Sequence, residues 1–355
     1  MKVLFYIGHP AHVHLFRNAI RELEKRGHSA VITSSDKEVA LNLLDAYGFK
    51  YINLGKNRKG LINKALRMLG LDYRLYQIGK KYRVDMFVSA GAPYAAHASK
   101  LLGKPAIAFD DTEHSTEQYQ LYAPFVDAVC TPSCFRKDLG KKQVRYDGYH
   151  ELAYLHPNQF KPNPKVLDEL ELGEGDRFFV LRFVSWRATH DIGQKGLDTD
   201  AKLQLVRDLK KHGRVYITSE VELTKDLEGY RLTTPPEKIH DLLYYATMYV
   251  GEGATMATEA GLLGTPSVYI SSLSNTMGNY EELEKRYGLV YSFNDAQKGI
   301  DAALDFLKNK DLKADWQKKR EKMLSEKIDV TKWMTDFIED YPESFREYVR
   351  THKRE

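Results

Sequence analysis

The sequence predicts an α/β protein with two Rossmann-like domains, each built on a parallel β-sheet, that face a common cleft. Short apolar runs such as Val3–Ile7 alternate with amphipathic segments of helical periodicity, which is typical of parallel strands buried on both faces. The chain has 355 residues, enough for two domains of about 100–200 residues each. The stretch from Tyr154 to Pro164 contains three prolines and little periodicity, and it separates two similar halves.

The first half alternates strands and helices from its beginning. A helix is expected over Val13–Arg26, where Leu15, Ile20 and Leu23 are apolar and Gly27 ends the helix. The elements that follow are strand Ala30–Thr33, helix Val39–Tyr47, strand Tyr51–Leu54, a long basic helical segment, strand Asp85–Ser89, a helix ending at Leu102, and strands Ala106–Phe109 and Ala128–Cys130.

The second half repeats this alternation, with a helical segment after it. In that last segment Trp333, Phe337 and Tyr341 recur at a spacing of four, so one apolar face is expected to pack against the body of the protein. The predicted strands are Phe178–Phe183, Arg214–Thr218, Met248–Val250 and Ser267–Ile270. The predicted boundaries are a first domain at 1–153, a linker at 154–165, a second domain at 166–335, and a helix with a charged tail at 336–355.

The overall composition excludes several classes of protein. The 53 Lys and Arg residues against 49 Asp and Glu residues give a net charge of only +4, which argues against a dedicated nucleic-acid binder. Cys130 and Cys134 lack the spacing of a zinc site or a disulfide framework, so a reducing cytoplasm is expected. No apolar run reaches the roughly 20 residues of a membrane span, and Gly8 and Pro10 interrupt the first run too early for a signal peptide.

The most informative stretch is Tyr249–Ile270. It predicts a buried strand, a turn at Gly251 and Gly253, a short helix, and a second strand after Gly264-Thr-Pro266. Glycines in such a turn allow the backbone to approach a ligand closely, and the free N–H groups that begin the helix form an anion site. Glu259 lies one turn further on, where its carboxylate suits ribose hydroxyls. The alternative is an ordinary strand-to-helix turn with a solvated Glu259.

The two-domain pattern, together with the signal Gly-x-Gly-x-x-x-x-x-Glu-Ala-x-x-x-Gly-x-Pro at residues 251–266, resembles glycosyltransferases of the GT-B fold. The chain is similar in particular to a prokaryotic family of unknown function that is associated with surface-polysaccharide genes. More distantly it resembles the peptidoglycan UDP-N-acetylglucosamine transferase. The segments that carry the family resemblance are Asp110–His114, Leu181–Trp186, Thr189–Gly193 and Gly251–Thr255.

This resemblance implies a division of roles between the domains. The first domain would hold the acceptor, and the second would bind the nucleotide-sugar, with Glu259 on the ribose and the loop Pro236–Ile239 on the uracil. Pro10 and Ala11 stand where the transferase has further glycines in its first loop. The nucleotide-sugar-binding candidates are Gly8, Arg182, Ser185, Arg187, His190, Lys238, Ile239, Gly253, Ala254, Thr255, Met256, Glu259 and Asn279.

Three histidines, His9, His12 and His14, follow the first strand. A neutral histidine could take the proton from an acceptor hydroxyl as the donor sugar is attacked. The resemblance places His12 opposite the donor, so His12 is the predicted base. A metal site and simple capping of the first helix remain the alternatives.

A second ionisable cluster follows the strand Ala106–Phe109. It consists of Asp110, Asp111, Glu113 and His114, and carboxylates placed so close together raise one another's pKa. Asp110, Asp111 and Glu113 are therefore candidate acid–base residues. Capping of a following helical turn by Asp111 is the alternative.

Charged residues also follow the first strand of the second half. Arg182 and Arg187, with Ser185, suit the charge of a leaving diphosphate, and His190 with Asp191 could orient Arg187 or the sugar. An ordinary surface ion pair between Arg187 and Asp191 is the alternative. The triplet Asp198-Thr-Asp200 matches a metal-binding pattern of another glycosyltransferase fold, but it precedes a helical run, so helix capping is predicted and no metal is expected.

The segment between Lys56 and Arg83 contains nine basic residues with interleaved leucines. Such a stretch can lie on an anionic membrane surface, or it can be a solvated helix that packs its leucines inward. The first alternative would place the protein at the inner face of the membrane, beside a lipid-linked acceptor.

These observations predict a metal-independent GT-B glycosyltransferase, in the hexosyltransferase class, with no cofactor. It would transfer a sugar from a nucleotide donor, UDP by resemblance, to a glycan or lipid-linked acceptor in surface-polysaccharide synthesis. Two alternatives remain: a UDP-sugar 2-epimerase, and a nucleotide-sugar-binding protein without catalysis. The stretch Ser89–Ala92 lacks the aspartate that such epimerases carry there, which favours the transferase.

Overall fold

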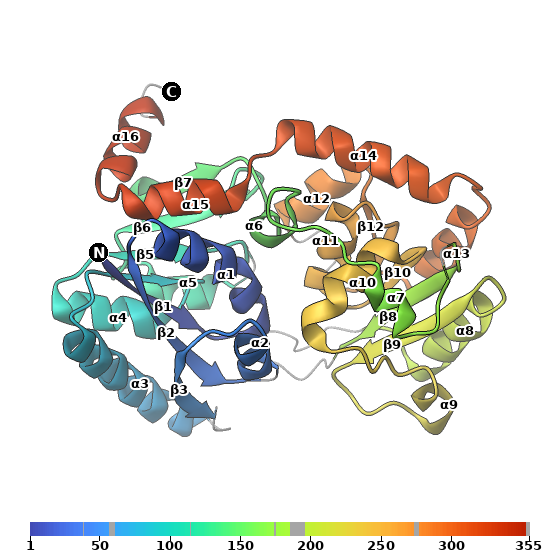
Figure 1. Cartoon of the computed structure of the whole chain (residues 1–355), viewed down its shortest axis with the longest axis horizontal. Coiled ribbons are helices and arrows are strands. Elements are labelled where there is room, and N and C mark those ends of the chain that lie inside the picture. The colour runs from blue at the N-terminus through green and yellow to red at the C-terminus, as the bar shows by residue number, and fades with distance from the viewer. Residues whose placement is uncertain are drawn as a thin grey trace. The chain divides into compact units, whose positions relative to one another are not determined.

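The computed structural model describes residues 1–37, 39–56, 61–113, 115–173, 175–184, 196–272 and 277–352, with only the backbone of residues 56 and 61–67. It contains two compact units (Figure 1). The first unit comprises residues 1–159 and 328–355, and the second comprises residues 160–327. Residues 328–335, predicted in the second domain, thus belong to the first unit. The reason is local packing: Ile328 donates its N–H to the Asp147 carbonyl at 3.0 Å, and the helix after it packs on the first unit.

The first unit is built on a parallel sheet of seven strands in the order β3-β2-β1-β4-β5-β6-β7. The strands are β1 (Lys2–Ile7), β2 (Ser29–Asp36), β3 (Tyr51–Lys56), β4 (Met86–Ser89), β5 (Ala106–Phe109), β6 (Ala128–Pro132) and β7 (Gln143–Tyr146). The helices are α1 (Pro10–Lys25), α2 (Ala40–Ala46), α3 (Leu61–Tyr82), α4 (Pro93–Leu102), α5 (Thr116–Tyr122), α6 (Leu152–Leu155), α15 (Val330–Glu339) and α16 (Glu343–His352). Helix α1 begins three residues before the predicted start, because His9 caps it and Pro10 suits its first position.

The second unit is built on a parallel sheet of five strands in the order β12-β11-β10-β8-β9. The strands are β8 (Phe178–Phe183), β9 (Arg214–Ser219), β10 (Met248–Gly251), β11 (Ser267–Ile270) and β12 (Val290–Phe293). The helices are α7 (Lys165–Asp168), α8 (Thr199–Leu209), α9 (Lys225–Glu228), α10 (Ile239–Tyr245), α11 (Ala254–Leu262), α12 (Gly278–Lys285), α13 (Ala296–Phe306) and α14 (Leu312–Glu326). Strands β8, β10 and β11 are fully or almost fully buried, as their continuous apolar runs predict.

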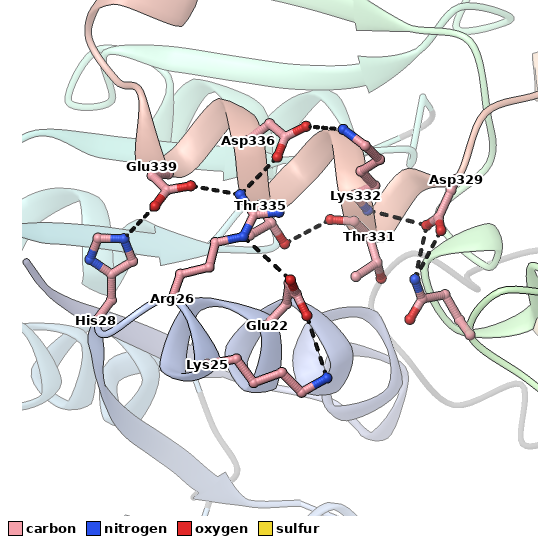
Figure 2. A network of polar contacts seen from close by, with 11 residues as sticks. Glu22, Lys25, Arg26, His28, Asp329, Thr331, Lys332, Thr335, Asp336 and Glu339 are labelled. Carbon is pink, nitrogen blue, oxygen red and sulfur yellow. Dashed lines mark hydrogen bonds and ion pairs between the residues drawn. The ribbon is translucent and has the colours of Figure 1, made fainter.

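Helix α15 returns the chain to the first unit and is attached there by ion pairs (Figure 2) and by aromatic packing. Arg26 Nη1 binds Asp336 Oδ1 at 2.8 Å and Glu339 Oε2 at 2.6 Å, and these bonds hold the pKa of Arg26 above its usual value. The predicted apolar face of this helix is confirmed, since the rings of Trp333 and Phe337 stack at 5.2 Å and Trp333 lies 4.7 Å from Tyr146. In the described part of the chain, no helix has both the length and the hydropathy that a membrane span requires.

Candidate functional site

The glycine turn after β10 has the predicted form of strand, turn and helix. Gly253 is the N-cap of α11 with φ −84°, and Thr255 in the first helical turn is exposed. A Cβ added to Gly251 would lie 2.5 Å from the Arg182 carbonyl oxygen, and one added to Gly253 would lie 2.6 Å from Arg182 Cγ. The glycines therefore allow β8 and Arg182 to lie directly against the turn. They thus have a structural role in addition to the predicted one, which is to let a ligand approach the backbone closely.

Arg182 is held in place beside the turn by polar contacts from β9. Its Nη1 donates to Thr218 Oγ1 at 3.2 Å, and its Nη2 forms an ion pair with Glu220. The side chain of Arg182 retains 23 % exposure, so the guanidinium is partly accessible beside the start of α11. A partly exposed arginine next to a helix N-terminus favours the binding of anions.

Glu252, between the two glycines, has a role that the sequence did not reveal. Its buried carboxylate accepts the N–H of Val184 at 3.1 Å and that of Leu197 at 2.6 Å, and it lies 3.6 Å from Lys202 Nζ. It thereby holds the two chain segments on either side of residues 185–195 next to the turn. The candidates Ser185, Arg187 and His190, with Asp191, lie outside the described residues.

Glu259 is buried, with 5 % exposure, so the alternative of a solvated glutamate is wrong. Its Oε1 lies 2.9 Å from Nε2 of His240, which is itself buried on α10. Because this contact holds one oxygen of the carboxylate, the orientation of the whole group is defined. His240 was not predicted as a site residue, although Lys238 and Ile239 just before it were.

Other candidates of the second unit make contacts of their own. Lys238 pairs with Glu169, and Ile239 is the first residue of α10. Asn279 on α12 is buried, and its Oδ1 accepts the N–H of Tyr280 at 2.9 Å. Asp198 caps α8 by accepting the Ala201 N–H at 2.8 Å, which confirms capping for that triplet.

In the first unit, the three histidines of the first loop have different roles. His9 is the N-cap of α1 and accepts the Ala11 N–H at 3.2 Å, so the capping alternative is confirmed for His9. His12 Nδ1 accepts the N–H of Gly8 at 3.3 Å. Burial, together with the charges of His9 and His150, lowers the pKa of His12 to about 3. His14 is buried on the same helix, with Nδ1 3.4 Å from Arg17 Nη1 and from Tyr47 Oη.

The carboxylates that follow β5 have different hydrogen-bond partners. Asp110 accepts the Thr112 N–H at 2.9 Å and a hydrogen bond from the Tyr122 hydroxyl, and burial raises its pKa. Glu113 turns to Arg136, whose backbone N–H and Nε each donate to it at 3.1 Å. His114 lies outside the described residues.

Asp111 pairs with His150, a residue that the sequence analysis did not select. Asp111 Oδ2 lies 3.2 Å from His150 Nδ1. Burial would raise the pKa of Asp111, but the charge and the hydrogen bond of His150 hold it below its usual value. The N-cap of α5 is Ser115, so the alternative that Asp111 caps this helix is wrong.

No usable signal for His150 was present in the sequence, because β7, the strand that it follows, was not predicted. In the structure His150 comes after the end of β7 at Tyr146, and the ends of parallel strands meet at one edge of a sheet. The described residues contain no group of three or more His, Cys, Asp or Glu side chains that could hold a metal ion.

Residues 1–343 match the protein family described as "Protein of unknown function (DUF354)". The chain belongs to this family. An uncharacterized protein of Methanocaldococcus jannaschii, MJ0665, is 24 % identical over 274 residues, which are 72 % of this chain and 78 % of the relative.

Solved structures confirm the GT-B prediction for the fold of this DUF354 protein. The UDP-GlcNAc 2-epimerase of Neisseria meningitidis bound to UDP-GlcNAc has a TM-score of 0.64 at 13 % identity, over 95 % of this chain and 99 % of the epimerase. The spinosyn forosaminyltransferase SpnP has a TM-score of 0.65 at 14 % identity, over 98 % of this chain and 99 % of the transferase. At such identities the likeness shows the fold alone.

Each unit of the DUF354 chain thus contains one cluster of predicted site residues. In the second unit, Arg182 lies against the glycine turn, and α11, which begins there, carries Glu259 in its second turn. In the first unit, His150 and Asp111 each affect the pKa of the other, and His150 and Asp111 both affect the pKa of His12. Glu113 and Lys238 are paired with other residues, outside these two clusters.

Proposed function

We propose that this protein is a metal-independent glycosyltransferase that uses a nucleotide-sugar donor. The observation that carries the proposal is in the second unit, where Arg182 lies against the glycine turn at the N-terminus of α11 and the same helix carries the buried Glu259 in its second turn. The N–H groups of Ala254 to Met256 and the positive end of the helix suit a diphosphate. A carboxylate that His240 holds in one orientation suits a pair of ribose hydroxyls.

The proposed chemistry needs charge stabilisation and a proton acceptor. When an acceptor hydroxyl attacks the donor sugar, the nucleoside diphosphate leaves with a growing negative charge. The first turn of α11 and Arg182 stabilise that charge by position, without a metal ion. The proton of the hydroxyl passes to the ionisable cluster of the first unit, which contains His12, Asp110 and Asp111. Six further residues remain predicted contributors to donor binding: Ser185, Arg187, His190, Lys238, Ile239 and Asn279.

Nucleotide binding tests the second-unit cluster directly. In calorimetric titrations with UDP, GDP, CMP and dTDP, we expect selective binding of UDP that does not depend on magnesium. Glu259→Ala is expected to weaken UDP binding by about tenfold or more, because the ribose loses a charged hydrogen-bond acceptor.

Glu228→Ala is the matched control, since Glu228 lies on α9 of the same unit and its side chain is 52 % exposed. It should leave the affinity unchanged. Equal affinities for the Glu259→Ala variant and the wild type would contradict the ribose role of Glu259. Tight UDP binding without turnover across many donors and acceptors would favour a binding protein.

A UDP-sugar 2-epimerase is the second candidate function, and the position of Asp110 beside the loop after β4 favours it. The loop after β4 has no carboxylate of its own, but a Cβ on Gly91 would lie only 3.4 Å from Asp110 Oδ2. Asp110 thus brings a carboxylate to this loop from the neighbouring strand, and burial raises its pKa as proton transfer would require. Incubation with UDP-N-acetylglucosamine in deuterated water decides: deuterium at C2 of the sugar would establish the epimerase and exclude the transferase.

For the acceptor side, we propose that the first unit contacts an anionic membrane surface. His97 on α4 contacts Asp72 on α3 and the Leu121 carbonyl on α5, and these three helices, with Phe125 just after α5, carry exposed apolar side chains. They are Leu69, Tyr73, Leu101, Leu121 and Phe125, of which Leu69, Tyr73 and Leu101 are 63–67 % exposed. The exposed cations Arg74, Lys80, Lys81 and Lys100 lie on two of these helices, α3 and α4. Apolar side chains mixed with cations favour anionic lipid.

Sedimentation with lipid vesicles tests this surface. We expect the protein to sediment with vesicles containing phosphatidylglycerol, less so with pure phosphatidylcholine, and less at high salt. The double variant Leu69→Ser, Tyr73→Ser should lose most of this binding. Val39→Ser, which changes an exposed apolar residue on another helix boundary, should not. Failure of the wild type to sediment with anionic vesicles would contradict the membrane role.

A further inference from the structure

The pair of Asp111 and His150 has the geometry of a proton-accepting dyad. Asp111 follows β5 and His150 follows β7, and Oδ2 of the first lies 3.2 Å from Nδ1 of the second. The His150 ring lies parallel to Tyr146, with an interplanar angle of 10°, and Tyr146 in turn packs on Trp333. Hydrogen bonding on one side and aromatic packing on the face therefore hold the imidazole in a single orientation.

The other ring nitrogen of His150 distinguishes this dyad from the other histidine–carboxylate pairs of the first unit. His150 is 9 % exposed, and its Nε2 is buried without a hydrogen-bond partner among the described residues. By contrast, His97 binds Asp72 and the Leu121 carbonyl, and His28 binds Glu339 and the Met1 amino group. A buried nitrogen without a partner costs about 1–3 kcal/mol, so it suggests a ligand group that completes it.

The charges around His150 suit a base that works near neutral pH. Burial lowers the pKa of His150, but Asp111, with contributions from Glu151 and Asp110, raises it above the ordinary histidine value. His12 on α1 and Tyr146 at the end of β7 are the other titratable groups that interact with the dyad. General bases are most effective when their pKa lies near the working pH. His12, with a pKa of about 3, is a much weaker base than His150.

We propose that His150, oriented by Asp111, is the catalytic base of the first unit, a role for which the sequence had suggested His12. This inference depends on the proposed transferase function. The lone pair on His150 Nε2 accepts the proton of the acceptor hydroxyl while the hydroxyl oxygen forms its bond to the anomeric carbon. The bond between that carbon and the diphosphate oxygen breaks, and the diphosphate leaves with the electron pair. Asp111 is a positioning residue that keeps the proton on Nδ1 and stabilises the imidazolium.

The test uses the full chain and UDP-N-acetylglucosamine, with water as the acceptor and release of UDP as the readout. His150→Gln is expected to lower kcat about a hundredfold or more while the calorimetric affinity for UDP stays unchanged. His28→Gln is the matched control, because His28 also pairs with a carboxylate but has both ring nitrogens engaged. It should leave both quantities unchanged.

The dependence of kcat/KM on pH distinguishes a catalytic role of His150 from a purely structural one, because a structural role would not shift this dependence. The base must be neutral, so kcat/KM should rise with pH through the pKa of His150. Asp111→Asn removes the main cause that raises this pKa, so the acidic limb of the profile should shift to lower pH even as the maximum falls. Full turnover in His150→Gln, or an acidic limb that does not move in Asp111→Asn, would overturn the assignment while leaving the donor site intact.

Two outcomes concern the function as a whole. No binding of any nucleotide by the wild type would refute the proposed function, and the role of His150 in sugar transfer with it. Nucleotide binding without turnover of any donor in a panel of UDP-sugars would favour a binding protein and refute both the transferase function and the base role of His150, whereas turnover that is unchanged in His150→Gln would overturn the base assignment alone.

Discussion

Glu252→Ala is expected to destabilise the second unit by about 3–5 kcal/mol, the cost of removing one partner from a buried ion pair. The carboxylate of Glu252 is fully buried, and it accepts two backbone N–H groups, from Val184 and Leu197. Without it, both N–H groups lose their acceptor and Lys202 Nζ, whose side chain is only 17 % exposed, loses its counter-charge. Urea denaturation followed by circular dichroism measures the loss.

Two companion variants show where this loss comes from. Glu228→Ala removes a glutamate of the same unit that pairs with Arg231 in solvent, and no measurable change in stability is expected. Lys202→Met keeps an apolar side chain of similar length but removes the ammonium, which lies over the Phe183 ring. It should cost less than Glu252→Ala, since the two N–H bonds remain. A Glu252→Ala variant as stable as the wild type would show that the flanks of residues 185–195 do not depend on this carboxylate.

The interior strands were predictable from the sequence because parallel strands bury both faces. The strands at 106–109, 178–183 and 267–270 have the predicted bounds, and each is a nearly continuous apolar run. Two edge strands, β7 and β12, were missed. Their sequences, Gln143-Val-Arg-Tyr146 and Val290-Tyr-Ser-Phe293, mix polar and apolar residues and include partly exposed side chains, so neither is a continuous apolar run.

The site was less predictable, because its decisive contacts join residues far apart in the sequence. The glycine turn, Arg182 and Glu259 could be selected from local motifs. The partners that orient them could not: His240 is 19 residues from Glu259, and Leu197 is 55 residues from Glu252. His150 was missed for the same reason, since its role arises only when β5 and β7 bring Asp111 and His150 to one edge of the sheet.

The domain boundary at the carboxyl side illustrates the same limit. The spacing of Trp333, Phe337 and Tyr341 predicts a helix that packs on the protein; α15 does so with Trp333 and Phe337, whereas Tyr341 lies just beyond its end. Periodicity, however, does not say which domain receives the helix. That choice depends on partners distant in sequence, such as Arg26 (Figure 2) and Tyr146.

Gly251→Ala should cost about 3 kcal/mol of stability, the upper part of the range for overpacked interiors. Gly251 stands opposite Arg182 in the pairing of β10 with β8, so the new Cβ would lie 2.5 Å from the Arg182 carbonyl oxygen and 2.8 Å from its nitrogen. Both are backbone atoms of a central strand, which cannot move without breaking the pairing. The midpoint of urea denaturation is expected to fall accordingly.

Gly253→Ala is the matched variant, and comparing the two separates the fold from the site. Its Cβ would meet Arg182 Cγ at 2.6 Å, an atom of a flexible side chain that can rotate away. The cost in stability should therefore be smaller, about 1 kcal/mol. That rotation moves the guanidinium away from its contact with Thr218 and from its position beside α11. We therefore expect Gly253→Ala to retain most of its stability and to bind UDP more weakly. Equal losses of stability in the two variants would contradict the distinction between backbone and side-chain contact.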